Sequence, residues 1–275
     1  MRAYHEPGPG SVAKAPPSRV FARPEGGGEG RRVGRSGGYW SQCRGASAAI
    51  MMVLPLLAIY EGGIAALGGD EALRAGVDAW IGRLTPDRFR VPDWAPSVVL
   101  ALGLIAWRIA EPGRFRMRWL VVAIVECAVL GAGLLALFRW FDHWFEAAGG
   151  SLPLEVASPV ELDLNAGELI GLVGAGIFEE AVFRLGLLGL CYAVLRVLLI
   201  PNVLATAMAV SGSALLFSMA HHVGEVPGAF SWSTFVFRWL AGVYFAWVMI
   251  LRGFGIAVGT HLAYDLLVVA DPWAG

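Results

Sequence analysis

Six polar residues suited to chemistry lie in or at the ends of long apolar runs in the second half of the sequence. In chain order they are Glu179, Glu180, Arg184, His221, His261 and Asp265. An ionisable side chain at the centre of a membrane helix costs about 2.5 to 3.5 kcal/mol on insertion scales. Each of these residues therefore needs a partner or a function.

Glu179, Glu180 and Arg184 form the densest group. On a helix, Glu180 and Arg184 are four residues apart with the acid on the N-terminal side, the orientation that favours an ion pair. Glu179 is rotated about 100° away and has no local partner, so it is a candidate general base or acid. A charge cluster that only fixes helix packing would show the same string, and the string alone does not separate the two interpretations.

Two further pairs repeat the four-residue spacing. Phe217 and His221 share one face of a predicted helix. His261 and Asp265 share one face of the last predicted helix. A lone histidine in a membrane helix more often makes a helix–helix hydrogen bond than performs catalysis. Three polar pairs on three apolar helices, however, are satisfied together only if they converge on one site inside a helical bundle.

The three pairs resemble, in order, the three motifs of the CPBP family of intramembrane proteases. The matching strings are Glu179-Glu180-x-x-x-Arg184, Phe217-x-x-x-His221 and His261-x-x-x-Asp265. This family contains CAAX prenyl proteases and bacteriocin-processing proteases, also called Abi proteins or type II CAAX endopeptidases. The resemblance covers about residues 167 to 270, and it implies an all-helical membrane bundle that hydrolyses a peptide bond in or beside the membrane.

The resemblance also implies roles for the matching residues. Glu179 would activate the attacking water, and His221 would hold the same water from the other side. Glu180, Arg184 and Phe217 would support the geometry of the site.

His261 and Asp265 would face the developing oxyanion as hydrogen-bond donors. Many family members have Asn where this chain has Asp265. Because an ionised Asp accepts hydrogen bonds and cannot donate them, three roles stay open for it. Asp265 could orient His261, donate when protonated, or ligate a metal.

The candidate catalytic side chains are also an acceptable ligand set for Zn²⁺. That set is Glu179, His221, His261 and Asp265. We favour a mechanism without a cofactor, since the family interpretation as a glutamate-type protease needs no metal. The last motif also lacks the internal glutamate base of an H-E-x-x-H zinc site.

The composition predicts an all-α, polytopic transmembrane helical bundle. Apolar residues make up 57% of the 275 residues and charged residues 16%, against about 25% charged in soluble domains. We expect about seven or eight spans, eight if the long fourth run breaks near Gly186 and Gly189. The runs are 46–67, 95–110, 119–138, 167–200, 203–222, 232–251 and 254–270.

The chain divides into three predicted regions. They are a disordered basic N-terminal tail (1–44), N-terminal transmembrane spans with interfacial segments (45–166) and a CPBP-like catalytic transmembrane core (167–275). The tail has nine glycines and eight Lys or Arg against three acids. Amphipathic spacing predicts interfacial segments at 73–84 and 138–145. By the positive-inside rule the N-terminus is cytoplasmic, which suits a multi-pass protein of the plasma (inner) membrane.

Charge and cysteine content exclude other classes of protein. With 21 basic and 22 acidic residues, the chain has no basic excess for binding nucleic acid. Three widely spaced cysteines suggest neither a disulfide framework nor a cysteine zinc site. Glu61 and Glu126 could join the site, although hydrogen bonds between early helices explain them equally well.

We therefore expect an intramembrane endopeptidase whose partners are the lipid bilayer and a membrane-associated or lipid-modified protein substrate. CAAX-type cleavage and the processing of sorting tags or propeptides all fit. Two alternatives are a catalytically silent family member that acts as a scaffold or immunity factor, and a proton-coupled transporter. The intact Glu179, His221 and His261 argue against the first, and the lack of a visible internal repeat argues against the second.

Overall fold

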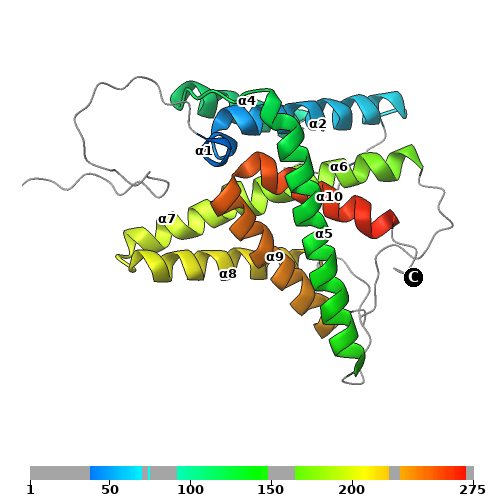
Figure 1. The fold of residues 1–275 in the computed structure, drawn as a ribbon, viewed down its shortest axis with the longest axis vertical. Helices are drawn as coiled ribbons and strands as arrows, with labels where there is room; N and C mark the ends of the chain where they lie inside the picture. Colours follow the sequence, from blue (N-terminus) through cyan, green and yellow to red (C-terminus); the bar gives the residue numbers. More distant parts are fainter. Residues whose placement is uncertain (1–37, 70–73, 75–91, 148–164, 223–229, 271–275) are drawn as a thin grey trace, which may run out of the picture. The chain divides into compact units, whose positions relative to one another are not determined.

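The fold is all-helical, as the composition predicts (Figure 1). The computed structural model describes residues 38–69, 74, 92–147, 165–222 and 230–270, and within these ranges it contains helices and no strand. The elements are α1 (Tyr39–Cys43), α2 (Ala46–Ala66), α4 (Ala95–Ala110), α5 (Arg118–Ala147), α6 (Ala166–Glu179), the π-helix η3 (Glu180–Leu188), α7 (Gly189–Val197), α8 (Asn202–Ala220), α9 (Trp232–Arg252) and α10 (Phe254–Ala270).

Four of these helices are long and apolar enough to cross a membrane, namely α2, α5, α8 and α9. The helices α4 and α10 are apolar but shorter, with 16 and 17 residues. The predicted run 167–200 is helical from Ala166 to Val197 but changes to a π-helix at Glu180 and back to an α-helix at Gly189. The number of long apolar helices is therefore smaller than the seven or eight predicted spans, because this run is divided and two helices are short.

The predicted interfacial segment at 138–145 is not a separate element. It is the C-terminal part of α5, and its first residue, Phe138, is buried against Phe237 of α9 with 4.6 Å between the ring centroids. The helix continues through this segment and one of its aromatic residues packs inward, while its location at the membrane interface stays a prediction. The other predicted interfacial segment, 73–84, lies outside the described residues except for Arg74. Most of the predicted tail, 1–37, also lies outside them, and α1 occupies its last part.

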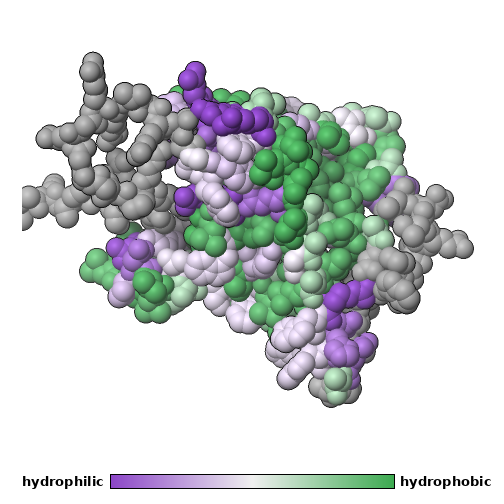
Figure 2. Space-filling model, viewed as in Figure 1, coloured by the Kyte–Doolittle hydropathy of each residue, from purple (hydrophilic) through white to green (hydrophobic). Residues whose placement is uncertain are grey.

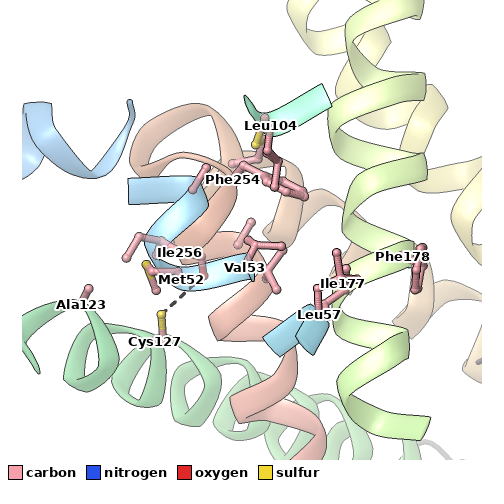
Figure 3. Packing of buried hydrophobic residues seen from close by; sticks show 14 of the residues in the cluster. Met52, Val53, Leu57, Leu104, Ala123, Cys127, Ile177, Phe178, Phe254 and Ile256 are labelled. Carbon is pink, nitrogen blue, oxygen red and sulfur yellow. Dashed lines mark hydrogen bonds between the residues drawn. The ribbon is translucent and has the colours of Figure 1, made fainter. Parts of the chain in front are cut away.

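Small residues allow α10 to pack closely against its neighbours. A Cβ atom added at Gly131 of α5 would lie 2.9 Å from the backbone nitrogen of Tyr264, and one at Gly259 of α10 would lie 2.6 Å from Cys127 Sγ. Cys127 itself is buried, with its thiol 3.6 Å from the carbonyl oxygen of Ile256 (Figure 3). It therefore acts as a small buried filler between α5 and α10.

The largest hydrophobic cluster surrounds α2. Figure 3 shows side chains of α2 facing side chains of α6 and α10, and the helices α4 and α5 also contribute. The labelled members are Met52, Val53, Leu57, Leu104, Ala123, Cys127, Ile177, Phe178, Phe254 and Ile256. This cluster supports α6 and α10, which lead into the polar residues of the three motifs.

The outer surface of α5 is apolar over its middle part (Figure 2). Large aliphatic side chains there, including Val121, Ile124 and Val129, are more than half exposed. Hydrophilic residues gather at the lower end of this helix in the same view. Exposed aliphatic residues between polar ends are typical of a surface that faces lipid. Trp140 and Trp232 are also exposed, at 62% and 71%.

Candidate active site

The first motif lies where α6 changes into the π-helix η3. Asn165 caps the start of α6 by accepting a hydrogen bond from the backbone N–H of Glu168 at 2.9 Å. Glu179 is the last residue of α6 and Glu180 the first of η3, and both are buried. π-Helical segments are rare and are frequently found at functional sites. Here the segment carries Glu180 and Arg184, and Glu179 directly precedes it.

Glu179 lies between the two motif histidines. Its Oε1 is 3.6 Å from Nε2 of His221, and its Oε2 is 3.7 Å from Nε2 of His261. Both separations are slightly longer than a direct hydrogen bond. The structure thus brings together one residue from each of the three motifs, as the predicted convergence requires.

Glu180 has different partners from its neighbour. It forms an ion pair with Arg184 over 3.3 Å, and its Oε1 lies 2.8 Å from Nδ1 of His261. The pairing with Arg184 is the one that the sequence spacing predicts. Glu180 therefore connects the arginine of the first motif to the histidine of the third.

Hydrogen bonds at Nδ1 determine what each histidine offers at Nε2. Nδ1 of His221 is 2.9 Å from the carbonyl oxygen of Phe217, and since a carbonyl only accepts, this nitrogen carries a proton. Nδ1 of His261 faces the Glu180 carboxylate, which likewise accepts when ionised. In their neutral forms both rings therefore turn an accepting Nε2 toward Glu179.

Asp265 faces the same nitrogen of His261 as Glu179 does. Its Oδ2 is 3.6 Å from Nε2 of His261. Exposure of the side chains increases from 7% at His261 to 18% at Asp265 and 28% at His221. Among the motif side chains, Glu180 is therefore inaccessible to solvent and His221 is the most exposed.

Aromatic rings line the buried side of the group. The guanidinium of Arg184 lies 4.2 Å from the ring centroid of Phe217 and 5.3 Å from that of Phe245. Phe245 stacks on His261, and Phe217 contacts the ring of His221. The sequence analysis missed Phe245, because nothing distinguishes it from the other apolar residues of its run.

Comparison with protein families supports the resemblance of the motifs. Residues 166–267 match the family model described as type II CAAX prenyl endopeptidase Rce1-like. The match supports the similarity of this region to the CPBP/CAAX protease family. The Rce1-like region contains all seven motif residues, from Glu179 to Asp265. No curated protein and no solved structure matches the chain.

Two acidic residues considered for the site lie in other clusters. Glu61 of α2 pairs with Arg74 at 3.1 Å and accepts a hydrogen bond from Ser97. Glu126 of α5 pairs with Arg252, whose Nη2 is 2.7 Å from its Oε2. Both carboxylates lie on helices outside the Rce1-like region and have partners of their own, so hydrogen bonding between helices accounts for them.

A metal ion would need at least three of the candidate ligands to converge on one point. Within the described part of the chain, no three His, Cys, Asp or Glu side chains have such an arrangement. Nδ1 of His261 faces Glu180, and the remaining nitrogen is shared between Glu179 and Asp265.

Proposed function

We propose that the protein is an intramembrane endopeptidase in which Glu179 activates a water molecule for attack on a peptide carbonyl. The position of Glu179 between two histidine Nε2 atoms, at 3.6 and 3.7 Å, is the observation that supports this best. A water oxygen can lie about 2.8 Å from each of two atoms that are this far apart.

His221 is suited to hold the same water. With Nδ1 bonded to the carbonyl of Phe217, the neutral ring can accept one hydrogen of the water at Nε2 while Glu179 accepts the other. A lone pair of the water is then directed at the substrate. Glu179 takes the proton as the C–O bond forms, and it returns this proton to the leaving nitrogen as the C–N bond breaks.

His261 is suited to stabilise the tetrahedral intermediate. While Nδ1 donates to Glu180, the ring can donate to an oxyanion from Nε2 only when it is doubly protonated. Asp265 and Glu179 both face that Nε2 and compensate the charge of an imidazolium. Asp265 then acts by orienting His261. This role does not require a proton on the Asp265 carboxyl group.

The substrate class follows from the family and from the surroundings of the site. A CAAX-type endopeptidase acts on a membrane-bound or prenylated protein, and this chain places its site among apolar helices. We propose that a membrane-associated or lipid-modified protein is cleaved on the side of the site where His221 is exposed. Location in the plasma membrane with a cytoplasmic N-terminus belongs to the same proposal.

The test compares two identical substitutions on one helix. Glu179→Gln removes the proposed base, whereas Glu168→Gln changes an exposed residue of α6. Both variants are purified in detergent and incubated with membrane proteins and prenylated peptides, and new C-termini are identified by mass spectrometry. Glu179→Gln should lose about 100-fold to 10,000-fold in rate, and Glu168→Gln should match the wild type.

Three outcomes would contradict the proposal. Undiminished cleavage by Glu179→Gln would exclude this carboxylate as the base. Absence of cleavage by the wild-type protein on every substrate would favour the scaffold alternative, and proton-coupled uptake by vesicles that contain it would favour the transporter.

A further inference from the structure

Phe245 is a buried aromatic residue of α9 that contacts the candidate site through its ring face. It is 1% exposed. Its ring lies parallel to that of His261, with 4.5 Å between the centroids and 13° between the planes. Offset or parallel stacking at this distance is an attractive arrangement of aromatic rings.

The same ring also contacts the arginine of the first motif. The Arg184 guanidinium lies 5.3 Å from the centroid of Phe245, within the range of a cation–π interaction. Among the described residues, neither terminal nitrogen of Arg184 has a hydrogen-bond acceptor. The guanidinium is therefore held by its ion pair with Glu180 and by aromatic faces. Phe245 thus contacts both partners of Glu180, namely Arg184 and His261.

We propose that Phe245 is a positioning residue, whose ring holds the imidazole plane of His261 so that Nδ1 meets Glu180 and Nε2 faces Glu179. This inference rests on the proposed function only for its kinetic consequence. The contacts at Nε2, 3.6 Å from Asp265 and 3.7 Å from Glu179, are longer than hydrogen bonds, so the bond at Nδ1 leaves the imidazole able to tilt about it. A flat ring 4.5 Å away opposes the tilt, because the two faces would then separate.

The kinetic consequence follows from the geometry of the site. A tilt of His261 moves Nε2 away from the place where the oxyanion forms, and a displacement of about 1 Å can cost on the order of 100-fold in rate. The oxyanion forms only as the water attacks, so the lost interaction belongs to the transition state and not to the bound substrate. Loss of the stack should therefore reduce kcat and leave KM largely unchanged.

The chain offers a matched control on the same helix. Phe237 is also a buried phenylalanine of α9, at 7% exposure, but it packs against Phe138 and Phe141 of α5. Phe245→Leu and Phe237→Leu remove the same atoms from buried positions. Both should lower the thermal unfolding temperature, so this measurement shows only that each residue is packed.

Two measurements distinguish positioning from packing. Phe245→Leu should lower kcat about 10-fold to 100-fold and change the shape of the pH–kcat profile, and Phe245→Tyr, which keeps the ring, should recover most of both. Phe237→Leu should keep the wild-type kcat and profile. In the purified protein, the low-field proton NMR signal of the His261 Nδ1–H should broaden or shift in Phe245→Leu and not in Phe237→Leu.

The NMR measurement needs no substrate, so it tests the inference even if the proposed function fails. An unchanged His261 signal in a folded Phe245→Leu variant would overturn the inference. Equal changes in kcat, pH profile and NMR signal in Phe245→Leu and Phe237→Leu would also overturn it, since packing alone would then explain them.

Discussion

Glu179 and Glu180 are adjacent in the chain but have separate environments. Glu180 is fully buried and contacts Arg184 and His261, whereas Glu179 faces His221 and His261 across gaps slightly longer than hydrogen bonds. One carboxylate thus has direct protein partners, and the other lies just beyond direct hydrogen-bond distance of two histidines. This difference separates a structural role from a chemical one.

Replacing Glu180 by Gln should destabilise the protein. The change leaves the Arg184 guanidinium, which is 2% exposed, without a negative partner at 3.3 Å. Breaking a buried ion pair on one side costs about 3 to 5 kcal/mol. Thermal unfolding in detergent should show a clearly lower midpoint than for Glu179→Gln, whose effect should be mainly on the rate. Similar midpoints for the two variants would contradict the assignment.

Asp265→Asn tests whether Asp265, which replaces the Asn of many CPBP members, orients His261 or ligates a metal ion. If Asp265 orients His261, the amide keeps nearly the same shape and supplies a donor, so substantial activity should remain. If Asp265 ligates a metal, the amide is a weaker ligand, and activity should fall and depend on added Zn²⁺.

The measurement compares cleavage by the wild type and Asp265→Asn before and after treatment with a strong chelator, followed by return of the metal. We expect both proteins to resist the chelator. Reversible inactivation of the wild type, together with about one bound metal ion per chain that Asp265→Asn lacks, would show that the metal alternative is right.

Contacts within one helix could be predicted from spacing, and contacts between helices could not. The pairs Glu180 with Arg184 and His261 with Asp265 are both four residues apart, and both are close in the structure. The hydrogen bond between Glu180 and His261 spans 81 residues. Its existence depends on how α10 packs against η3, which no local pattern determines.

Among the elements, the packing of α5 on α10 has little tolerance for added volume at Gly131. A Cβ at Gly131 would lie 2.9 Å from the backbone of Tyr264, whereas one at Gly133 would have its nearest neighbour, the Tyr244 hydroxyl, at 3.5 Å. The first contact is with backbone, which cannot rotate away. Both glycines lie on α5, so the difference between them comes from the atoms that surround each one.

Gly131→Ala should therefore lower the free energy of unfolding by about 1 to 3 kcal/mol, the range for overpacking. Gly133→Ala should have little effect or a small stabilising one, because Ala favours the helix. Thermal unfolding of the two variants in one detergent measures the difference. Equal midpoints would show that α5 can move away from α10 at no cost.

Helix boundaries were predicted well where the chain forms a regular apolar helix. The predicted run 254–270 coincides with α10, and the run 232–251 differs from α9 by one residue. The change to a π-helix at Glu180 could not be predicted, since Glu180–Leu188 has an ordinary apolar composition. Its buried charged residues form their contacts with α8, α9 and α10. These contacts join residues that are far apart in the chain, so the sequence of the segment alone does not predict a π-helix.

For the whole molecule, α1 connects the N-terminal part of the chain to the Rce1-like region. The Tyr39 hydroxyl donates a hydrogen bond to Glu126, which also binds Arg252 at the end of α9. Gly253, with φ of +96°, lies so close to α1 that an added Cβ would be 2.8 Å from Cα of Arg44. Helix α1 thus packs against the turn that joins α9 to α10.

Two truncations separate the role of α1 from that of the preceding residues. A variant that lacks residues 1–36 keeps α1 and should retain the stability and activity of the full chain. A variant that lacks residues 1–44 removes Tyr39 and exposes the pair of Glu126 and Arg252. It should unfold at a lower temperature and cleave more slowly, because the turn that leads into α10 loses its support. Equal behaviour of both variants would show that α1 is dispensable.

The order of the helices along the chain has a consequence for biosynthesis. His261 and Asp265 lie on α10, which follows in sequence every helix that it packs against, namely α2, α5, α6 and α9 together with η3. A nascent chain that has already inserted those elements still lacks the third motif. The candidate site is therefore completed only when α10 packs against its neighbours. Under the proposed function, we expect a partly synthesised chain to be unable to cleave proteins in the membrane where it is being inserted.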